Sequence, residues 1–121
     1  MREKDEKTLK IEEKIGQLLM AGFEGLEPPD YILEWLSEGQ LGGVILFRRN
    51  VKSPQQVARL TRMCREAAKY PILISIDQEG GIVARLREQF TESPGAMALS
   101  AAGSPELAGR MSEGMGIELK A

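Results

Sequence analysis

One short segment of the sequence combines residue types that could perform chemistry. The run Asp77-Gln78-Glu79-Gly80-Gly81 directly follows an apolar stretch, and loops that follow strands build the ligand sites of parallel α/β proteins. Asp77 and Glu79 are two positions apart, so an extended backbone would direct both carboxylates to one side, with about 7 Å between their Cα atoms. Such a pair could act as the acid and nucleophile of a glycosidase, or could bind a divalent cation. A charged turn that ends a strand explains the same residues, so all three interpretations stay open at this point.

The composition argues against a metal site at this segment and against a nucleic-acid partner. The 121 residues contain no His, and the next carboxylate after Glu79 is that of Glu88, so a cation would lack a third protein ligand nearby. The absence of His also removes His-based triads and the usual proton shuttle. The 16 Lys and Arg residues against 18 Asp and Glu residues offer no basic surface for phosphate backbones. We therefore expect no nucleic-acid partner.

The remaining composition predicts a soluble protein of a reducing compartment. No apolar run approaches the roughly 20 residues that span a bilayer, and the charged first seven residues are not followed by the apolar stretch of a signal peptide. Cys64 is the only cysteine, which excludes an internal disulfide. It fits the apolar stripe of a helix, so we predict a small core residue rather than a nucleophile. The sequence therefore predicts a cytoplasmic location and no membrane partner.

Hydrophobic periodicity predicts the elements that must position the candidate segment. Ser53-Pro54 and Ser104-Pro105 are typical helix starts, with a capping residue before a proline at the first helical position. Helices are predicted over 8–18, 31–38, 54–68 and 105–121, and strands over 19–23, 44–47 and 72–76. Residues 1–10 are mostly charged and are expected either to fray or to extend the first helix. The stretch 77–95 is predicted to be loop and irregular chain.

The alternation of strands and amphipathic helices predicts an α/β fold with parallel strands, because a crossover helix returns the chain to the same end of the sheet. A flavodoxin-like domain needs five strands, and only three are recognisable. A (β/α)₈ barrel of about 250 residues uses roughly 31 residues a unit, which is close to the spacing in this chain. The chain would then be less than half of such a barrel, so we predict one partial domain over residues 1–121 with about three βα units.

Four motifs in the same order and spacing closely resemble the N-terminal (β/α)₈ barrel of family 3 glycoside hydrolases, in the β-N-acetylhexosaminidase branch. The resemblance covers about Lys14 to the end of the chain. The motifs are Ile15–Phe23, Gly42–Asn50, Ile76–Gly81 followed by Val83, Arg85 and Leu86, and Ala96–Leu99.

The resemblance implies a retaining exo-hydrolase that removes terminal β-linked N-acetylglucosamine, in many bacteria during the recycling of cell-wall sugars, without a cofactor. It implies that Asp77 is not catalytic but holds hydroxyls of the terminal sugar, which suits a lone carboxylate at a strand end. Glu79 and Arg85 are assigned weaker, supporting roles in the same loop. This replaces the interpretation of Asp77 and Glu79 as an acid and nucleophile pair.

The sequence departs from the family pattern in two ways. Ile82 stands where the family usually has arginine, and we expect its side chain to turn toward apolar neighbours. The family's nucleophile aspartate and its acid/base histidine would lie beyond the fourth strand, so the resemblance implies a fragment that is inactive alone. A noncatalytic sugar-binding domain or subunit is the alternative. Open sheet edges predict self-association, or completion by the rest of a barrel.

Overall fold

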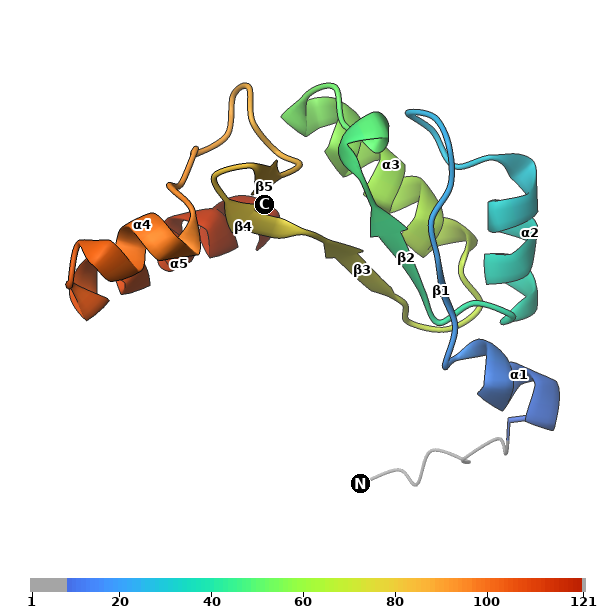
Figure 1. Cartoon of the computed structure of the whole chain (residues 1–121). Coiled ribbons are helices and arrows are strands. Elements are labelled where there is room, and N and C mark those ends of the chain that lie inside the picture. Colours follow the sequence, from blue (N-terminus) through green and yellow to red (C-terminus); the bar gives the residue numbers. More distant parts are fainter. Residues whose placement is uncertain (1–8, 121) are drawn as a thin grey trace, which may run out of the picture.

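The computed structural model describes residues 9–120, and its centre is a parallel sheet of three strands (Figure 1). The strands are β1 (Met20–Ala21), β2 (Gly43–Leu46) and β3 (Leu73–Ile76), and they lie in the order β1-β2-β3. Gly43 of β2 is aligned with Met20 on one side and with Leu73 on the other. The predicted parallel strands, adjacent in chain order, are therefore confirmed.

The core lies between this sheet and two helices, α2 (Asp30–Glu38) and α3 (Pro54–Ala67), which pack against each other. The β2 side chains Val44 and Leu46 are almost completely buried there. The helices contribute a further set of fully buried side chains, namely Ile32, Leu36, Leu60 and Cys64. Burial raises the pKa of the Cys64 thiol to about 11, so the predicted core role of this residue is confirmed and a reactive thiolate is excluded.

Local chemistry explains where these helices begin and end. The Ser53 hydroxyl accepts a hydrogen bond from the backbone N–H of Gln56 at 3.2 Å, as predicted for the start of α3. Helix α2 ends at Gly39, whose φ of 76° is the left-handed conformation that closes many helices. Both helices match their predicted extents within a residue or two.

The first helix, α1 (Ile11–Gly16), is shorter than predicted, and the expectation for residues 1–10 falls largely outside the described residues. A polar cluster joins α1 to the chain between α3 and β3. The Glu13 carboxylate accepts hydrogen bonds from Lys69 Nζ at 2.6 Å and from the Tyr70 hydroxyl at 2.8 Å. Hydrogen bonds from Lys69, from the Lys10 backbone and from Tyr70 lower the pKa of Glu13 from its usual 4.5 to about 2.

The chain after β3 differs from the sequence prediction. Residues predicted as loop form an antiparallel hairpin of β4 (Gln78–Gly80) and β5 (Val83–Ala84). An unpredicted helix, α4 (Ala96–Ala101), then precedes α5 (Pro105–Lys120). Earlier in the chain, a short 3₁₀ helix (Arg48–Asn50) that was also not predicted follows β2. In Figure 1, α4 and α5 lie beyond the hairpin, away from α2 and α3. Neither of these last two helices contains a buried residue.

The prediction that Ile82 turns toward apolar neighbours is wrong, because this residue is 92% exposed. Ile82 lies in the turn between β4 and β5, and the preceding Gly80 and Gly81 have positive φ angles of 87° and 58°. The side chain at the hairpin tip therefore faces solvent.

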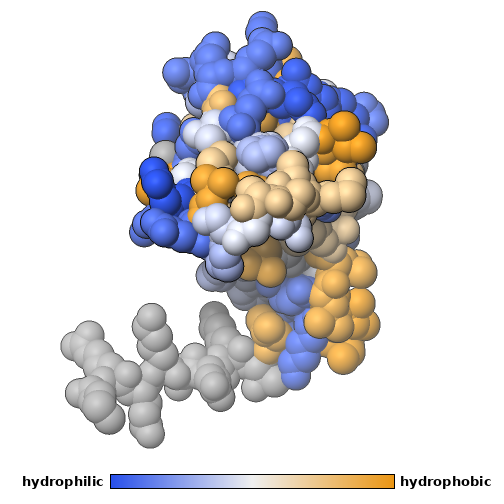
Figure 2. Space-filling model, turned by 60° about the vertical axis from the view of Figure 1, so that its left-hand side comes forward, coloured by the Kyte–Doolittle hydropathy of each residue, from blue (hydrophilic) through white to orange (hydrophobic). Residues whose placement is uncertain are grey.

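One face of the sheet is open within the described residues. Gly43 lies between Met20 and Leu73, and a Cβ on Gly43 would meet the Met20 methyl group and the Leu73 Cβ. The Leu73 side chain is nevertheless 71% exposed. Exposed apolar side chains of α1 and its C-terminal end continue this surface, namely Ile11, Ile15, Leu18 and Leu19. Figure 2 shows hydrophobic surface at the lower end of the molecule, the level at which α1 lies in Figure 1.

Candidate functional site

The C-terminal ends of the three parallel strands lie at one edge of the sheet, because their register is parallel throughout. Phe23, Arg48 and Asp77 follow β1, β2 and β3 at this edge. Buried Asn50 joins the first two loops: its Nδ2 donates to the carbonyl of Phe23 at 3.1 Å and to that of Gly25 at 2.8 Å. Its Oδ1 accepts from the backbone N–H of Phe47 at 2.9 Å. These contacts fix the loops next to Asp77.

The hairpin β4–β5 returns the chain to Asp77 eight residues later. Gly80 permits this turn because its φ of 87° is strained for any residue with a side chain. A Cβ at this position would also lie 2.6 Å from the Pro94 carbonyl oxygen and 2.8 Å from that of Ser93. Gly81 donates its N–H to the same Ser93 carbonyl at 2.8 Å. The paired glycines therefore allow a close backbone approach that anchors the hairpin tip.

Arg85 lies next to Asp77 at the open end of the hairpin. Its Nη2 donates to Asp77 Oδ2 at 3.2 Å, with the Arg85 side chain 25% exposed and the Asp77 side chain 43% exposed. The carboxylate is therefore charge-paired and still in contact with solvent. Arg85 Nε is covered by protein and has no hydrogen-bond partner among residues 9–120. A buried donor that stays without a partner costs about 1–3 kcal/mol.

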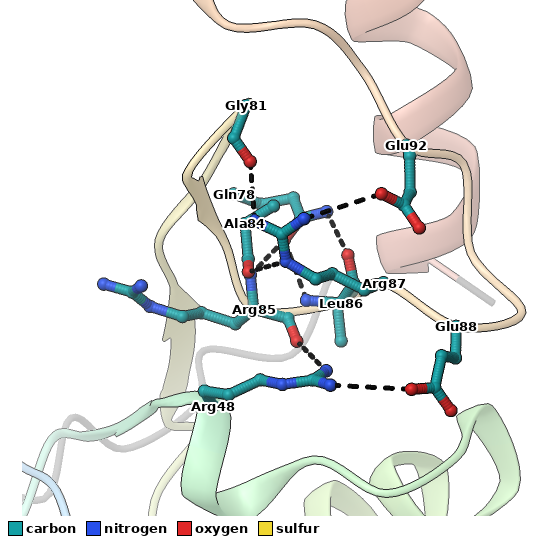
Figure 3. Close-up of polar contacts among 9 residues, drawn as sticks. All are labelled: Arg48, Gln78, Gly81, Ala84, Arg85, Leu86, Arg87, Glu88 and Glu92. Carbon is teal, nitrogen blue, oxygen red and sulfur yellow. Dashed lines mark hydrogen bonds and ion pairs between the residues drawn. The ribbon is translucent and has the colours of Figure 1, made fainter.

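The backbone of Arg85 is fixed on both sides (Figure 3). Its N–H donates to Gln78 Oε1 at 2.9 Å, and its carbonyl accepts from Arg48 Nη1 at 3.1 Å. In Figure 3 the Arg85 side chain points away from the other labelled side chains. The hydrogen bond of Arg48 therefore ties the loop after β2 to Arg85, the residue that contacts Asp77.

Arg87 holds the hairpin from its other face (Figure 3). Its Nη2 donates to the Gly81 carbonyl at 2.6 Å and its Nε to the Ala84 carbonyl at 3.2 Å. Its Nη1 lies 3.5 Å from Glu92 Oε2. Neither Arg87 nor Gln78 was predicted as a functional residue, although the alternation of Arg85 and Arg87 after a short apolar run was a signal for two cations of different roles.

Glu79 does not share the surroundings of Asp77. It is exposed and lines a hollow of about 520 Å³ between the hairpin, α4 and α5, together with Ser100 and Ser104. Glu79 forms no hydrogen bond or ion pair within the part of the chain that the structure describes. The structure thus brings together Asp77 and Arg85, two of the three residues named from sequence, and places the third beside a different surface.

Two further features bear on the class of site. Among residues 9–120, no three side chains of His, Cys, Asp or Glu lie together as a metal ion would require. In the same part of the chain, no helix combines the length and the apolar composition of a membrane span. The site is therefore a solvent-accessible carboxylate and guanidinium pair at the carboxyl edge of a parallel sheet, which is where α/β proteins of the barrel class bind small ligands.

Comparison with known proteins identifies the family. The family model described as the glycosyl hydrolase family 3 N-terminal domain matches residues 10–121. The chain therefore belongs to glycosyl hydrolase family 3.

Relatives and solved structures agree with this assignment. A beta-hexosaminidase from Stenotrophomonas maltophilia (strain R551-3) is 44% identical over 77 residues, which are 64% of this chain and 23% of the relative. A beta-hexosaminidase from Alkalilimnicola ehrlichii is 41% identical over 100 residues, 81% of this chain and 29% of the relative. The chain thus spans about a quarter of the length of the relatives it matches.

The structure of a glycoside hydrolase family 3 β-N-acetylglucosaminidase from Paenibacillus sp. str. FPU-7 is also similar. The match covers 93% of the present chain and 22% of the Paenibacillus enzyme, with 47% sequence identity and a TM-score of 0.89. The predicted fold class, a partial (β/α)₈ barrel with parallel strands, is therefore confirmed.

Proposed function

We propose that this chain supplies the sugar-holding part of a retaining β-N-acetylhexosaminidase. In this proposal the Asp77 carboxylate accepts hydrogen bonds from hydroxyls of a terminal β-linked N-acetylglucosamine. The single observation that carries it is the Asp77–Arg85 pair at the carboxyl edge of the sheet, 3.2 Å apart and accessible to solvent. A charged acceptor forms stronger hydrogen bonds with hydroxyls than a neutral one, and a fixed guanidinium keeps this acceptor in one orientation.

Arg85 and Glu79 have different roles in the proposal. Arg85 orients the Asp77 carboxylate by donating Nη2 to one of its oxygens, which leaves the other oxygen for a sugar hydroxyl. Glu79 is given only a weaker role at the loop surface, because its exposed side chain lines the hollow beside α4 and α5 and has no hydrogen-bond or ion-pair partner among residues 9–120. No cofactor takes part. The carbohydrate is the proposed partner, and the cytoplasm is the proposed location.

Binding of N-acetylglucosamine tests this proposal. We expect the sugar to shift the backbone ¹H–¹⁵N resonances of residues around Asp77 and Arg85 in the purified chain, and Asp77→Asn to weaken that binding at least about tenfold, because a charge-assisted hydrogen bond contributes about 1.5–3 kcal/mol. Asp30→Asn is the matched control, since Asp30 is exposed at the start of α2. Equal affinities of the Asp77 and Asp30 variants would contradict the proposal.

Turnover tests whether this chain is inactive alone, which is expected both of an enzyme fragment and of its alternative, a noncatalytic sugar-binding domain or subunit. The 121 residues contain no His, and the family's acid/base is implied to be a histidine. We expect no hydrolysis of an aryl β-N-acetylglucosaminide by this chain alone, since bound sugar has no route to a glycosyl-enzyme. Turnover above that of the Asp77→Asn variant, prepared in the same way, would overturn this expectation.

We also propose that the chain self-associates through its open sheet face and edges. Both β1 and β3 are edge strands within the described residues, and Leu73 of β3 is largely exposed. Unpaired edges with apolar side chains promote strand pairing between chains. We expect sedimentation to show concentration-dependent oligomers that Leu73→Lys reduces, whereas Leu107→Lys on α5 leaves them unchanged. A monomer at all concentrations would contradict the proposal.

A further inference from the structure

Gln78 forms an unusual set of contacts for a side chain next to the candidate site. Its Oε1 accepts hydrogen bonds from the backbone N–H of Arg85 at 2.9 Å and of Leu86 at 3.0 Å. Its Nε2 donates to the Leu86 carbonyl at 2.9 Å. A glutamine amide has two acceptor positions and two donors, so both acceptor positions and one donor serve the same two-residue stretch of backbone (Figure 3).

These contacts begin where the backbone pairing of the hairpin ends. The pairing of β4 with β5 aligns Gln78 with Ala84, and Arg85 and Leu86 lie just beyond that last pair. There the Gln78 side chain substitutes for a neighbouring strand and determines the direction of the chain. Leu86 is almost fully buried, so one side of this stretch is fixed in apolar surroundings. The side chain of Arg85 is then directed toward Asp77.

We propose that Gln78 is a positioning residue for the sugar-holding carboxylate, acting through Arg85. Its amide fixes the Arg85 backbone so that Arg85 Nη2 reaches Asp77 Oδ2. The relevance of this contact to sugar rests on the function proposed above, but the contact itself can be measured without sugar. The alternative is that Gln78 only stabilises the hairpin, in which case losing it lowers stability and leaves the Asp77–Arg85 contact intact.

A double-substitution experiment on the full chain distinguishes these roles. The observable is the chemical shift of Arg85 Nε–H in ¹H–¹⁵N spectra, which Asp77→Asn changes because the two side chains touch. We expect Gln78→Met, which keeps the side-chain length and removes all three hydrogen bonds, to reduce this Asp77-dependent change at least about twofold. Gln55→Met is the matched control, since Gln55 is an exposed residue of α3 and its substitution should leave the change intact. Gln78→Glu, which keeps the acceptor for both amides, should restore most of it.

An undiminished Asp77-dependent shift in Gln78→Met, with a lower thermal midpoint, would show that Gln78 is only structural and would overturn the inference. Should that variant fail to fold, the same measurement on Gln78→Asn, whose amide is one methylene shorter, decides: the inference expects a reduced Asp77-dependent change, and an undiminished change overturns it.

Titration with N-acetylglucosamine separates this inference from the proposed function. If Gln78→Met reduces the Asp77-dependent change in the Arg85 Nε–H chemical shift but the chain binds no sugar at Asp77, only the proposed function is refuted. Sugar binding of equal affinity in Gln78→Met and in the unaltered chain refutes the positioning role alone.

Discussion

The part of the chain before Asp77 and the part after it use similar amphipathic helices in different surroundings. Helices α2 and α3 bury Ile32, Leu36, Leu60 and Cys64 against the sheet, whereas α5, longer than either, buries none of its residues. An amphipathic pattern therefore predicts a helix but not what covers it. The candidate site lies at the junction, with Asp77 at the end of the packed sheet and Arg85 on a hairpin held mainly by polar contacts.

The largest expected effect contrasts one leucine from each region. Leu60→Ala in α3 removes a fully buried side chain and is expected to lower the free energy of unfolding by about 2–5 kcal/mol, because a cavity remains. Leu107→Ala in α5 removes a side chain that already contacts solvent and should change it by less than about 1 kcal/mol. Urea denaturation measures both, and equal losses would contradict the difference between the regions.

Asn50→Ala should have the next largest effect, since Asn50 is buried and makes three hydrogen bonds to two loops. Removal leaves buried backbone groups unpaired, at a cost of about 1–3 kcal/mol each before water compensates. We expect a loss of about 3 kcal/mol. Gln40→Ala, at an exposed residue that bonds only another exposed side chain, is the control. A loss no greater than that of the control would refute the role given to Asn50 at the strand ends.

Two glycines provide a smaller and opposite pair of effects. Gly80→Ala combines a positive φ with a Cβ that would lie 2.6 Å from a backbone oxygen, so we expect a loss of about 1–3 kcal/mol. Gly109→Ala, in the exposed α5, meets nothing within 4 Å and should gain about 0.5–1 kcal/mol of helix stability. Thermal denaturation checks both signs. Stabilisation by Gly80→Ala would mean that the hairpin does not adopt this turn.

The smallest expected effect is a pH dependence at α1. The pKa of Glu13 is lowered from 4.5 to about 2 by hydrogen bonds from Lys69, from the Lys10 backbone and from Tyr70. A lowered folded-state pKa contributes stability that is fully present above pH 4.5 and is lost as the pH falls toward 2. Urea midpoints between pH 6 and pH 2 should therefore fall less steeply for Glu13→Gln than for Glu12→Gln, its exposed neighbour. Identical slopes for the two variants would show that these hydrogen bonds do not lower the pKa of Glu13 in the folded chain.

The sequence was informative where local chemistry decides the structure. The Ser53 cap, the Gly39 end of α2 and the apolar strand before Asp77 each depend on a few neighbouring residues, and each was predicted. The parallel order of the strands followed from the crossover helices, because their handedness and length leave few alternatives.

The sequence was uninformative where contacts distant along the chain decide. The hairpin after Asp77 depends on Gln78 reaching Arg85 and on Gly80 packing against Pro94, and no periodicity in so short a stretch records either contact. The prediction that Ile82 packs inward failed for the same reason, since a hairpin tip has no core beside it. The separation of Glu79 from Asp77 could not be predicted either, because the period of two applies only to a regular strand, and the pairing of β4 with β5 is irregular between Gln78 and Gly80.

A crystal structure of this chain with N-acetylglucosamine bound tests the central claim most directly. The account predicts sugar hydroxyl oxygens at about 2.5–3.0 Å from the Asp77 carboxylate, with Arg85 Nη2 still on the same carboxylate and the Gln78 amide on the Arg85 and Leu86 backbone. Sugar bound in the hollow beside Glu79, with Asp77 free of ligand, would contradict the account.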